Sequence, residues 1–254
     1  MSEGYLLRAD AVLDVSRTEP ADAVATAGGR ILSVGAFDDL RREHSSLEVL
    51  DLSGRTLLSG LTDTHCHFYE LARRLVGVDL RGARDEDELR ARLRVHGARM
   101  PRDGSWVAGG GWSPERFLGR PGVDRHFLDG IFGARPVALE SRDFHTLWCN
   151  TAALEAAGVM DGAEAPPGGE IGRGEDGSPD GLLYETAWEL IWAARPPEPV
   201  STRAAWLRRA QEHAHARGVT GLHTMEPEAA WEGLCALAAE DGLRLRVWHH
   251  SPLD

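Results

Sequence analysis

Two histidines spaced by one residue end an apolar run near position 60, and this stretch constrains the fold most. It reads Thr56-Leu57-Leu58-Ser59-Gly60-Leu61-Thr62-Asp63-Thr64-His65-Cys66-His67-Phe68. In an extended strand, side chains two residues apart point to one face about 6.6–6.8 Å apart, so both imidazoles can reach one ion at about 2.0–2.1 Å each. Asp63 lies two residues before His65, so its side chain points to the same face of the strand and is a candidate to orient one imidazole ring. The stretch predicts a buried strand that carries a metal site.

A second histidine pair with the same spacing serves as an internal control. His213-Ala214-His215 lies in a helical pattern, where residues two apart are separated by about 200° around the axis and cannot share an ion. We expect that pair on a solvated helix face. For His65 and His67 the alternative is also two polar residues that meet solvent, but the apolar run before them and the position of Asp63 favour a metal site.

Charge and residue content exclude several classes of function. The net charge is −12 and the pI is near 5.4, so we expect no nucleic-acid partner and no acidic-membrane partner. All 28 basic residues are arginines, which excludes mechanisms that need a lysine of this chain. Three widely separated cysteines and an N-terminus without a basic region and a long apolar stretch predict a cytoplasmic protein without a signal peptide or membrane span.

The first 55 residues alternate short apolar runs with turns. Gly28-Gly29 before Arg30 is typical of a hairpin, residues 37–42 suggest a short helix, and residues 47–52 suggest a closing strand. We predict that residues 1–55 form a small β-rich subdomain.

From residue 56 onward, strands alternate with helices, which is typical of α/β architecture with parallel strands. We expect helices over residues 85–100, 151–157 (capped by Asn150), 185–195, 201–217 and 228–240, and a long excursion or hairpin over 162–181. Four barrel-type strands start near Thr56, Val137, Val219 and Leu243, whereas a complete (β/α)₈ barrel needs eight. Residues 56–254 are therefore predicted to be the first half of such a barrel in a larger enzyme.

Several motifs together resemble a known family. The segment Leu58–His67 is similar to the first-strand signature of the amidohydrolase superfamily, Pro-Gly-Phe/Leu-x-Asp-x-His-x-His, with Ser59 in place of the usual proline. Three further segments resemble its family 3 branch, which includes N-substituted formamide deformylases: the Gly110-Gly111-Trp112 loop, residues 141–154, and Gly177-Ser178-Pro179-Asp180-Gly181-Leu182-Leu183-Tyr184-Glu185. Gly218-Val219-Thr220-Gly221-Leu222-His223 resembles a later strand of that branch.

The resemblance implies a TIM-type barrel preceded by part of a β-sandwich. It implies that His65 and His67 bind a divalent metal, Zn²⁺ or a similar ion. Glu185 is a candidate bridging ligand in place of a carboxylated lysine, with a structural glutamate at a helix start as the alternative. In this family the remaining histidine ligands and the catalytic aspartate lie on later strands, so we expect them beyond Asp254. Thr224 stands where an acidic residue is common.

Further candidates for the substrate pocket are Trp112, Asp143 and His145. The alternative for Trp112 is a core residue, and for Asp143 and His145 a capping network before the helix at Asn150. His223 and His249 are expected to be core or rim histidines whose ring nitrogens have hydrogen-bond partners. Cys66 points to the opposite face of the strand from His65 and His67, and we expect it to be a buried packing residue.

Together these features predict a metal-dependent amidohydrolase. It would hydrolyse a non-peptide C–N bond of an amide, formamide or cyclic amide through metal-activated water, with a small molecule as its substrate. The alternative is a truncated, non-catalytic relic or a subunit that needs a partner, because four barrel strands alone leave open edges that favour a homo-oligomer or a complementary half.

Overall fold

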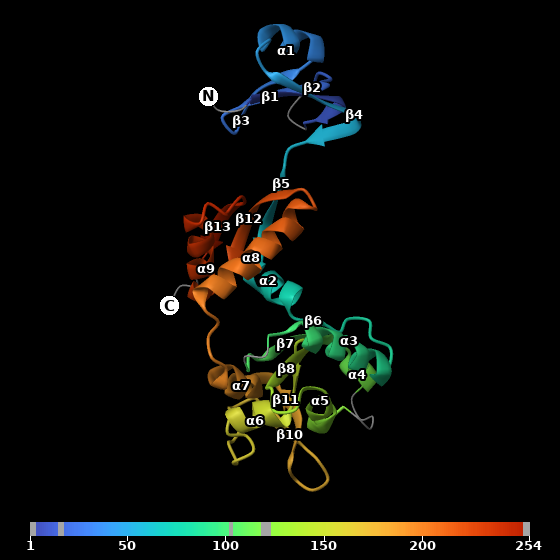
Figure 1. Cartoon of the computed structure of the whole chain (residues 1–254), viewed down its shortest axis with the longest axis vertical. Helices are drawn as coiled ribbons and strands as arrows, with labels where there is room; N and C mark the ends of the chain where they lie inside the picture. The colour runs from blue at the N-terminus through green and yellow to red at the C-terminus, as the bar shows by residue number, and fades with distance from the viewer. Residues whose placement is uncertain (1–3, 15–17, 102–103, 118–122, 251–254) are drawn as a thin grey trace. The chain divides into compact units, whose positions relative to one another are not determined.

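A computed structural model describes the chain except residues 1–3, 15–17, 102–103, 118–122 and 251–254 (Figure 1). The end of the chain at Asp254 lies outside the described residues. Contacts between Cα atoms divide the chain into two units: Met1–Thr62 with Gly218–Gly221, and Asp63–Arg217 with Leu222–Asp254. No helix in the described part of the chain is both long and apolar enough to cross a membrane.

The first unit contains one four-stranded sheet with a helix packed against it. The sheet order is β3-β2-β1-β4, from strands Gly4–Leu13 (β1), Ala23–Ala27 (β2), Arg30–Gly35 (β3) and Glu48–Leu58 (β4). Pairing is antiparallel except between β1 and β4. Gly28 and Gly29 both have positive φ, as the predicted hairpin turn requires. Leu40 of α1 (Phe37–Glu43) packs on Leu6 and Ala25 and closes this small core.

The largest sheet of the second unit is mixed. Its order is β10-β11-β9-β8-β7-β6, from strands Val78–Asp79 (β6), Val107–Trp112 (β7), Val137–Ser141 (β8), Thr146–Cys149 (β9), Glu170–Arg173 (β10) and Pro179–Tyr184 (β11). Strands β6, β7 and β8 run parallel, and β9, β11 and β10 add antiparallel pairs. The predicted excursion over 162–181 contributes the β10–β11 hairpin.

Alternation along the strands of this sheet builds a core on each face, because successive side chains point to opposite sides. Val137 and Leu139 of β8 join one cluster, whereas Ala138 between them joins the other. The first cluster is covered by α3 (Glu86–Arg99) and α5 (Arg125–Phe132), and the second by α6 (Thr151–Ala156) and α7 (Trp188–Ala194) (Figure 1). The short helices α4 (Pro114–Phe117) and η1 (Glu185–Ala187) complete this part.

A three-stranded sheet, in the order β13-β12-β5, holds the histidine pair. Its strands are Leu61–Cys66 (β5), Val219–Met225 (β12) and Arg246–His250 (β13). The helices beside it are α2 (Phe68–Val76), α8 (Val200–His215) and α9 (Glu228–Ala239); α8 packs against both α2 and α9. The predicted helices over 201–217 and 228–240 are confirmed by α8 and α9.

Two expectations about the strands are wrong. The strand at Val137 does not belong with those at Val219 and Leu243, because β8 pairs with β7 and β9 in the six-stranded sheet. The strand before the histidines was expected to be buried, yet Leu61 is 49% exposed and the other β5 residues are exposed as far as His65. β5 is the edge strand of its sheet, so one of its edges has no hydrogen-bonded neighbour among the described strands and is open to solvent.

Candidate metal centre

Strand β5 presents His65 and His67 close to each other. Their ring centroids are 5.8 Å apart and the rings are nearly perpendicular, at 82°. The Nδ1 atom of His67 lies 2.9 Å from the carbonyl oxygen of Met225 at the end of β12. A carbonyl oxygen only accepts hydrogen bonds, so Nδ1 carries the proton and Nε2 keeps its lone pair free. That is the arrangement in which metal-binding histidines are commonly held.

The end of β12 also fixes the chain just after the histidines. Helix α2 begins at Phe68, and its first backbone N–H groups need acceptors. The N–H of Phe68 donates to Oγ1 of Thr224 at 3.2 Å, and the N–H of Tyr69 donates to the Glu226 carboxylate at 2.8 Å. Thr224 and Glu226 are buried. Burial raises the pKa of Glu226, and the N–H donors of α2 oppose that rise. The two side chains therefore anchor His67, the N-cap of α2.

Asp63 and Cys66 make local contacts beside the pair. The Asp63 carboxylate accepts from the backbone N–H of His65 at 3.1 Å, so its described contact is with the backbone of that residue. The Cys66 thiol lies 3.4 Å from the carbonyl oxygen of His223, and burial, with the nearby Asp63 and Glu226 carboxylates, raises its pKa to about 11. Cys66 thus contacts β12, in line with the packing role expected for it.

Further histidines lie on the neighbouring strands. Nδ1 of His223 is 3.0 Å from Nε2 of His250, and the His223 ring stacks on Trp248 at 4.7 Å. His223 is therefore a satisfied rim histidine, as expected. His249 differs, because both of its ring nitrogens are buried and have no hydrogen-bond partner among the described residues. Its ring instead contacts Trp231 at 5.2 Å.

The structure does not bring Glu185 together with His65 and His67. Among the described residues, no three His, Cys, Asp or Glu side chains converge as a metal-binding group. Glu185 instead meets another candidate, with its carboxylate 2.9 Å from Nδ1 of His145. Glu185 itself (φ 48°) and Phe144 (φ 63°), the residue before His145, have positive φ angles, a conformation that costs energy in residues other than glycine. The metal role of Glu185 stays a prediction.

The remaining candidates, Asp143 and Trp112, make contacts within the turn after β8 and within the core. Asp143 accepts from the Ser141 hydroxyl at 2.6 Å and from the N–H of His145 at 3.2 Å, and the first of these bonds is the main reason that its pKa is lowered. Its described bonds thus lie within the turn that joins β8 to β9. Trp112 is fully buried and donates from its indole to the carbonyl of Leu139, so the core alternative is the one observed.

Sequence reasoning missed Met225 and Glu226 as supports of the centre. Their contacts with His67 and Tyr69 span 158 and 157 positions. The one available signal was the polar Thr224 at the end of a predicted strand, together with Glu226 two residues later.

Comparison with known proteins identifies the family. The sequence model of the amidohydrolase family matches residues 48–254. The chain is 36% identical over 202 residues to Protein LONG AFTER FAR-RED 3 of Arabidopsis thaliana, covering 79% of this chain and 34% of that protein. It is 32% identical over 182 residues to N-substituted formamide deformylase of Arthrobacter pascens, covering 70% of this chain and 33% of the enzyme. It is 29% identical to the putative amidohydrolase YtcJ of Bacillus subtilis (strain 168), covering 80% and 39%.

A solved structure shares the fold. An uncharacterized metal-dependent hydrolase from Pyrococcus furiosus superimposes with a TM-score of 0.76 at 24% identity, covering 98% of this chain and 50% of that one. The chain thus spans about half of that structure and about a third of the length of the curated relatives. With the family match over most of its length, the chain belongs to the amidohydrolase family.

Proposed function

We propose that the chain is part of a metal-dependent hydrolase that cleaves a non-peptide C–N bond and holds Zn²⁺ on His65 and His67. The observation that carries the proposal is the orientation of His67. Its Nδ1–H faces the Met225 carbonyl at 2.9 Å, and this leaves Nε2 available beside the His65 ring. The family supports a divalent metal, and the formamide deformylase relative supports the C–N bond.

The residues present fit half of a zinc site. Two imidazoles on one strand are common zinc ligands and leave at least two positions of a tetrahedral site to other ligands. When bound, such an ion lowers the pKa of a bound water towards about 7 and polarises a substrate carbonyl. The chain's own contribution is positional: β5 presents the two rings, Met225 sets the tautomer of His67, and Thr224 with Glu226 holds the helix that follows.

We also propose a barrel context for this site. The sheet β13-β12-β5 would form part of a (β/α)₈ barrel, and the β-rich unit at the N-terminus would contribute to a composite β-sandwich. The long connection from α2 to α8, which contains the six-stranded sheet, would then be an insertion after the first barrel strand.

Zinc binding tests the metal site directly. Purified chain should bind about one equivalent of zinc, measured by elemental analysis after dialysis and by titration calorimetry, and His65→Ala/His67→Ala should abolish that binding. The matched control is His213→Ala/His215→Ala, which removes a pair of the same spacing from helix α8 and should leave zinc binding unchanged. Equal zinc content in both double variants would contradict the assignment.

The reaction is tested with an N-substituted formamide. Hydrolysis breaks the bond between the formyl carbon and nitrogen, adds the water oxygen to the formyl carbon to give formate, and leaves the amine protonated. Formate release by the zinc-loaded chain, compared with the corresponding formate ester, separates C–N from C–O cleavage. Cleavage of the ester without cleavage of the amide would exclude the proposed bond type.

A second candidate is a subunit or relic that binds the metal without turning over substrate. It is favoured by one observation: in the described part of the chain, His65 and His67 have no third ligand. This candidate predicts zinc binding that depends on both histidines but no formate release. Formate release lost in His65→Ala/His67→Ala would exclude it.

A further inference from the structure

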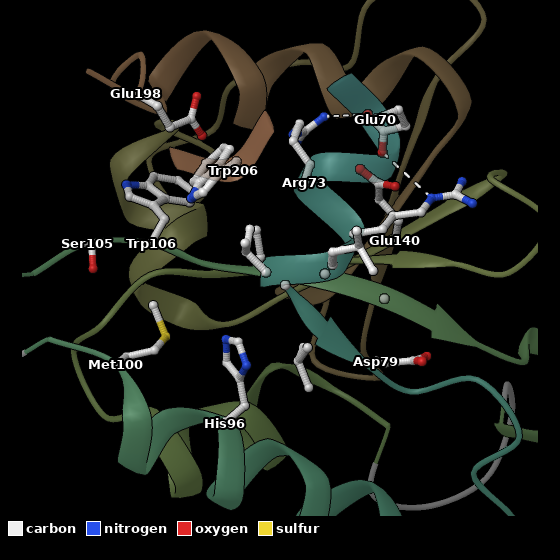
Figure 2. Close-up of a pocket in the computed structure, with 18 of the residues that line it drawn as sticks. Glu70, Arg73, Asp79, His96, Met100, Ser105, Trp106, Glu140, Glu198 and Trp206 are labelled. Atoms are coloured by element: carbon white, nitrogen blue, oxygen red, sulfur yellow. Dashed lines mark hydrogen bonds and ion pairs between the residues drawn. The ribbon is translucent and has the colours of Figure 1, made fainter. Parts of the chain in front are cut away.

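A large cavity lies among α2, α3, β7, β8 and α8, and neither His65 nor His67 lines it. Its volume is about 980 Å³, at the upper end of the range of about 300–1,000 Å³ typical of small-molecule sites. Figure 2 shows Glu70, Arg73 and Glu140 on one side, His96 and Met100 on the opposite side, and the tryptophans Trp106 and Trp206 at one end. The cavity is therefore large enough for a ligand, and it is separate from the metal centre.

The lining of the cavity is cationic, in contrast to the whole chain. Seven arginines and four carboxylates line it, a net formal charge of +3, whereas the chain carries −12. A concave surface with an excess of one charge concentrates ligands of the opposite charge. The surplus of arginine therefore indicates an anionic ligand.

Three of the four carboxylates are already neutralised by neighbouring arginines. Glu70 pairs with Arg73 at 2.9 Å, Asp79 pairs with Arg81 at 2.7 Å, and Glu198 pairs with Arg195. The fourth, Glu140, has no side-chain hydrogen bond or ion pair to any residue that the structure describes, but it lies in the field of Arg73, Arg74 and Arg195. These carboxylates leave part of the arginine charge unpaired.

Two arginines have all their hydrogen-bond donors free of partners among the described residues. Arg99 at the end of α3 and Arg209 on α8 are exposed, and neither has an ion pair or side-chain hydrogen bond within the described ranges of the chain. A guanidinium offers five N–H donors in a planar fork that matches a carboxylate. Arg99 and Arg209 are thus the arginines best suited to bind a carboxylate from outside the chain.

Two half-buried tryptophans have indole N–H groups without an acceptor in the described part of the chain. Trp112, Trp148 and Trp188 donate their indole N–H to the carbonyls of Leu139, Asp124 and Leu183. Trp106 and Trp206 make no such bond to a described residue, although buried indole N–H groups usually find a partner. Both line the cavity, and the Trp206 ring is fixed by stacking on Tyr69 at 6.4 Å.

Helix α8 places an aromatic ring and the guanidinium of Arg209 on one face. Thr202, Trp206 and Arg209 all line the cavity and follow one another at intervals of four and three residues, the spacing of neighbours on a helix surface. A ligand that lies along this stripe contacts the Trp206 ring and the Arg209 guanidinium together.

We propose that this cavity binds a small organic carboxylate with a planar aromatic body. Arg209, beside Trp206 on α8, binds the carboxylate, Arg99 is a second arginine of the lining that is open to it, and Trp206 and Trp106 contact the ring. This site is independent of the metal centre, since its lining contains neither of the proposed zinc ligands.

The probe is 2-naphthoate, titrated into the full chain by calorimetry, with neutral 2-naphthamide as its matched analogue. We expect saturable binding of the acid and at least about tenfold weaker binding of the amide. Arg99→Gln/Arg209→Gln should weaken naphthoate binding about tenfold. Arg208→Gln is the control, because Arg208 neighbours Arg209 on α8 but pairs with Glu240 and does not line the cavity.

The aromatic contact is tested by Trp206→Leu, which should also weaken naphthoate binding, against Trp231→Leu, an exposed tryptophan outside the cavity. His65→Ala/His67→Ala should bind naphthoate as the unaltered chain does, so failure of the metal centre and failure of this site are distinguishable. Absence of saturable binding at millimolar naphthoate, equal binding of the amide, or an equal loss in Arg208→Gln would overturn the proposal.

Discussion

Arginine makes most of the ion pairs among the described residues and histidine the others, because the chain has no lysine. These contacts differ widely in environment. The Arg203 side chain is 9% exposed and joins α8 to α9, donating to the Ala229 carbonyl at 3.0 Å and to the Glu232 carboxylate at 2.7 Å. Arg208 also links α8 to the end of α9, through an ion pair with Glu240. This pair lies at the surface, and 41% of the Arg208 side chain is exposed. The same residue type therefore has two different energetic roles.

Replacing Arg203 should cost far more stability than replacing Arg208. We expect Arg203→Met to lower the free energy of unfolding by about 2–3 kcal/mol, because it removes both hydrogen bonds that this largely buried guanidinium makes to α9. Arg208→Met should cost at most about 1 kcal/mol, the usual limit for an exposed pair. Urea denaturation of the two variants measures the difference. Losses of equal size would show that the burial of Arg203 carries no extra energy.

Glu140 makes stability depend on pH. Burial raises the pKa of its carboxyl above the ordinary value of 4.5, the nearby Glu70 carboxylate adds to the rise, and Arg73 and Arg74 oppose it. The folded state therefore binds the proton more tightly than the unfolded state. This contribution to stability is fully present below the unfolded pKa and is lost as pH rises through the folded pKa. Wild type should thus lose stability relative to Glu140→Gln as pH rises above the ordinary pKa of 4.5.

Glu115 provides a control of opposite sign. A hydrogen bond from Ser113 lowers the pKa of its carboxyl, so its contribution is present above the unfolded pKa and is lost as pH falls. Relative to wild type, Glu115→Gln should therefore become less stable as pH rises. Urea denaturation at several pH values tests both variants. If the Glu140→Gln and wild-type curves run parallel across pH, the argument for Glu140 fails.

At the scale of elements, the glycines of β7 allow the central strands to approach closely. Gly110 has φ of +155°, and a Cβ atom there would lie 2.1 Å from the Glu140 carbonyl oxygen of β8. Gly110→Ala should therefore destabilise the protein by about 3 kcal/mol or more. Gly130 in helix α5 has nothing within 4 Å of an added Cβ, so Gly130→Ala should stabilise by up to about 1 kcal/mol. Thermal unfolding of the two variants should shift in opposite directions, and a shift in the same direction would contradict this account.

Elements with local signals were predicted correctly. Helix α3 follows the predicted range 85–100, with the Asp85 side chain accepting from the N–H of Glu88 at its start. Asn150 caps α6 as expected, and it also accepts from Val137 and donates to two backbone carbonyls. A helix cap and the hydrophobic periodicity that follows it involve residues only a few positions apart, so both can be recognised in the sequence without knowledge of the fold.

Elements that depend on distant partners were not predicted. The apolar run of β8 does not reveal that it pairs with β7 and β9 instead of β12, because hydrogen-bonded neighbours determine sheet membership. The exposure of β5 was missed for the same reason. In the candidate centre, the spacing of His65 and His67 is local and was found, whereas the Met225 carbonyl that orients His67 comes from a strand 158 residues later.

The molecule as a whole is built from units that are not continuous in sequence. Residues 218–221 belong with the first 62 residues, and strands β5 and β12 each pass from one unit into the other. Leu61 donates its N–H to the carbonyl of Gly218 at 2.8 Å, so β5 finds its partner strand only after the whole connection that contains the six-stranded sheet.

This pairing has a consequence for the order of synthesis on the ribosome. The ribosome adds about 5–20 residues per second, so β12 is made roughly 10–30 s after β5. During that time β5, which carries His65, has no β12 to pair with. In nascent chains stalled before residue 218, the Cys66 thiol should therefore be alkylated rapidly. In chains that extend beyond residue 225 and have been released, alkylation of Cys66 should be slower, since that thiol contacts His223. Equal alkylation at both stages would contradict this order. The strand proposed to bind the metal is thus made well before the strand that pairs with it, and until β12 follows, its open edge can pair with other exposed strands.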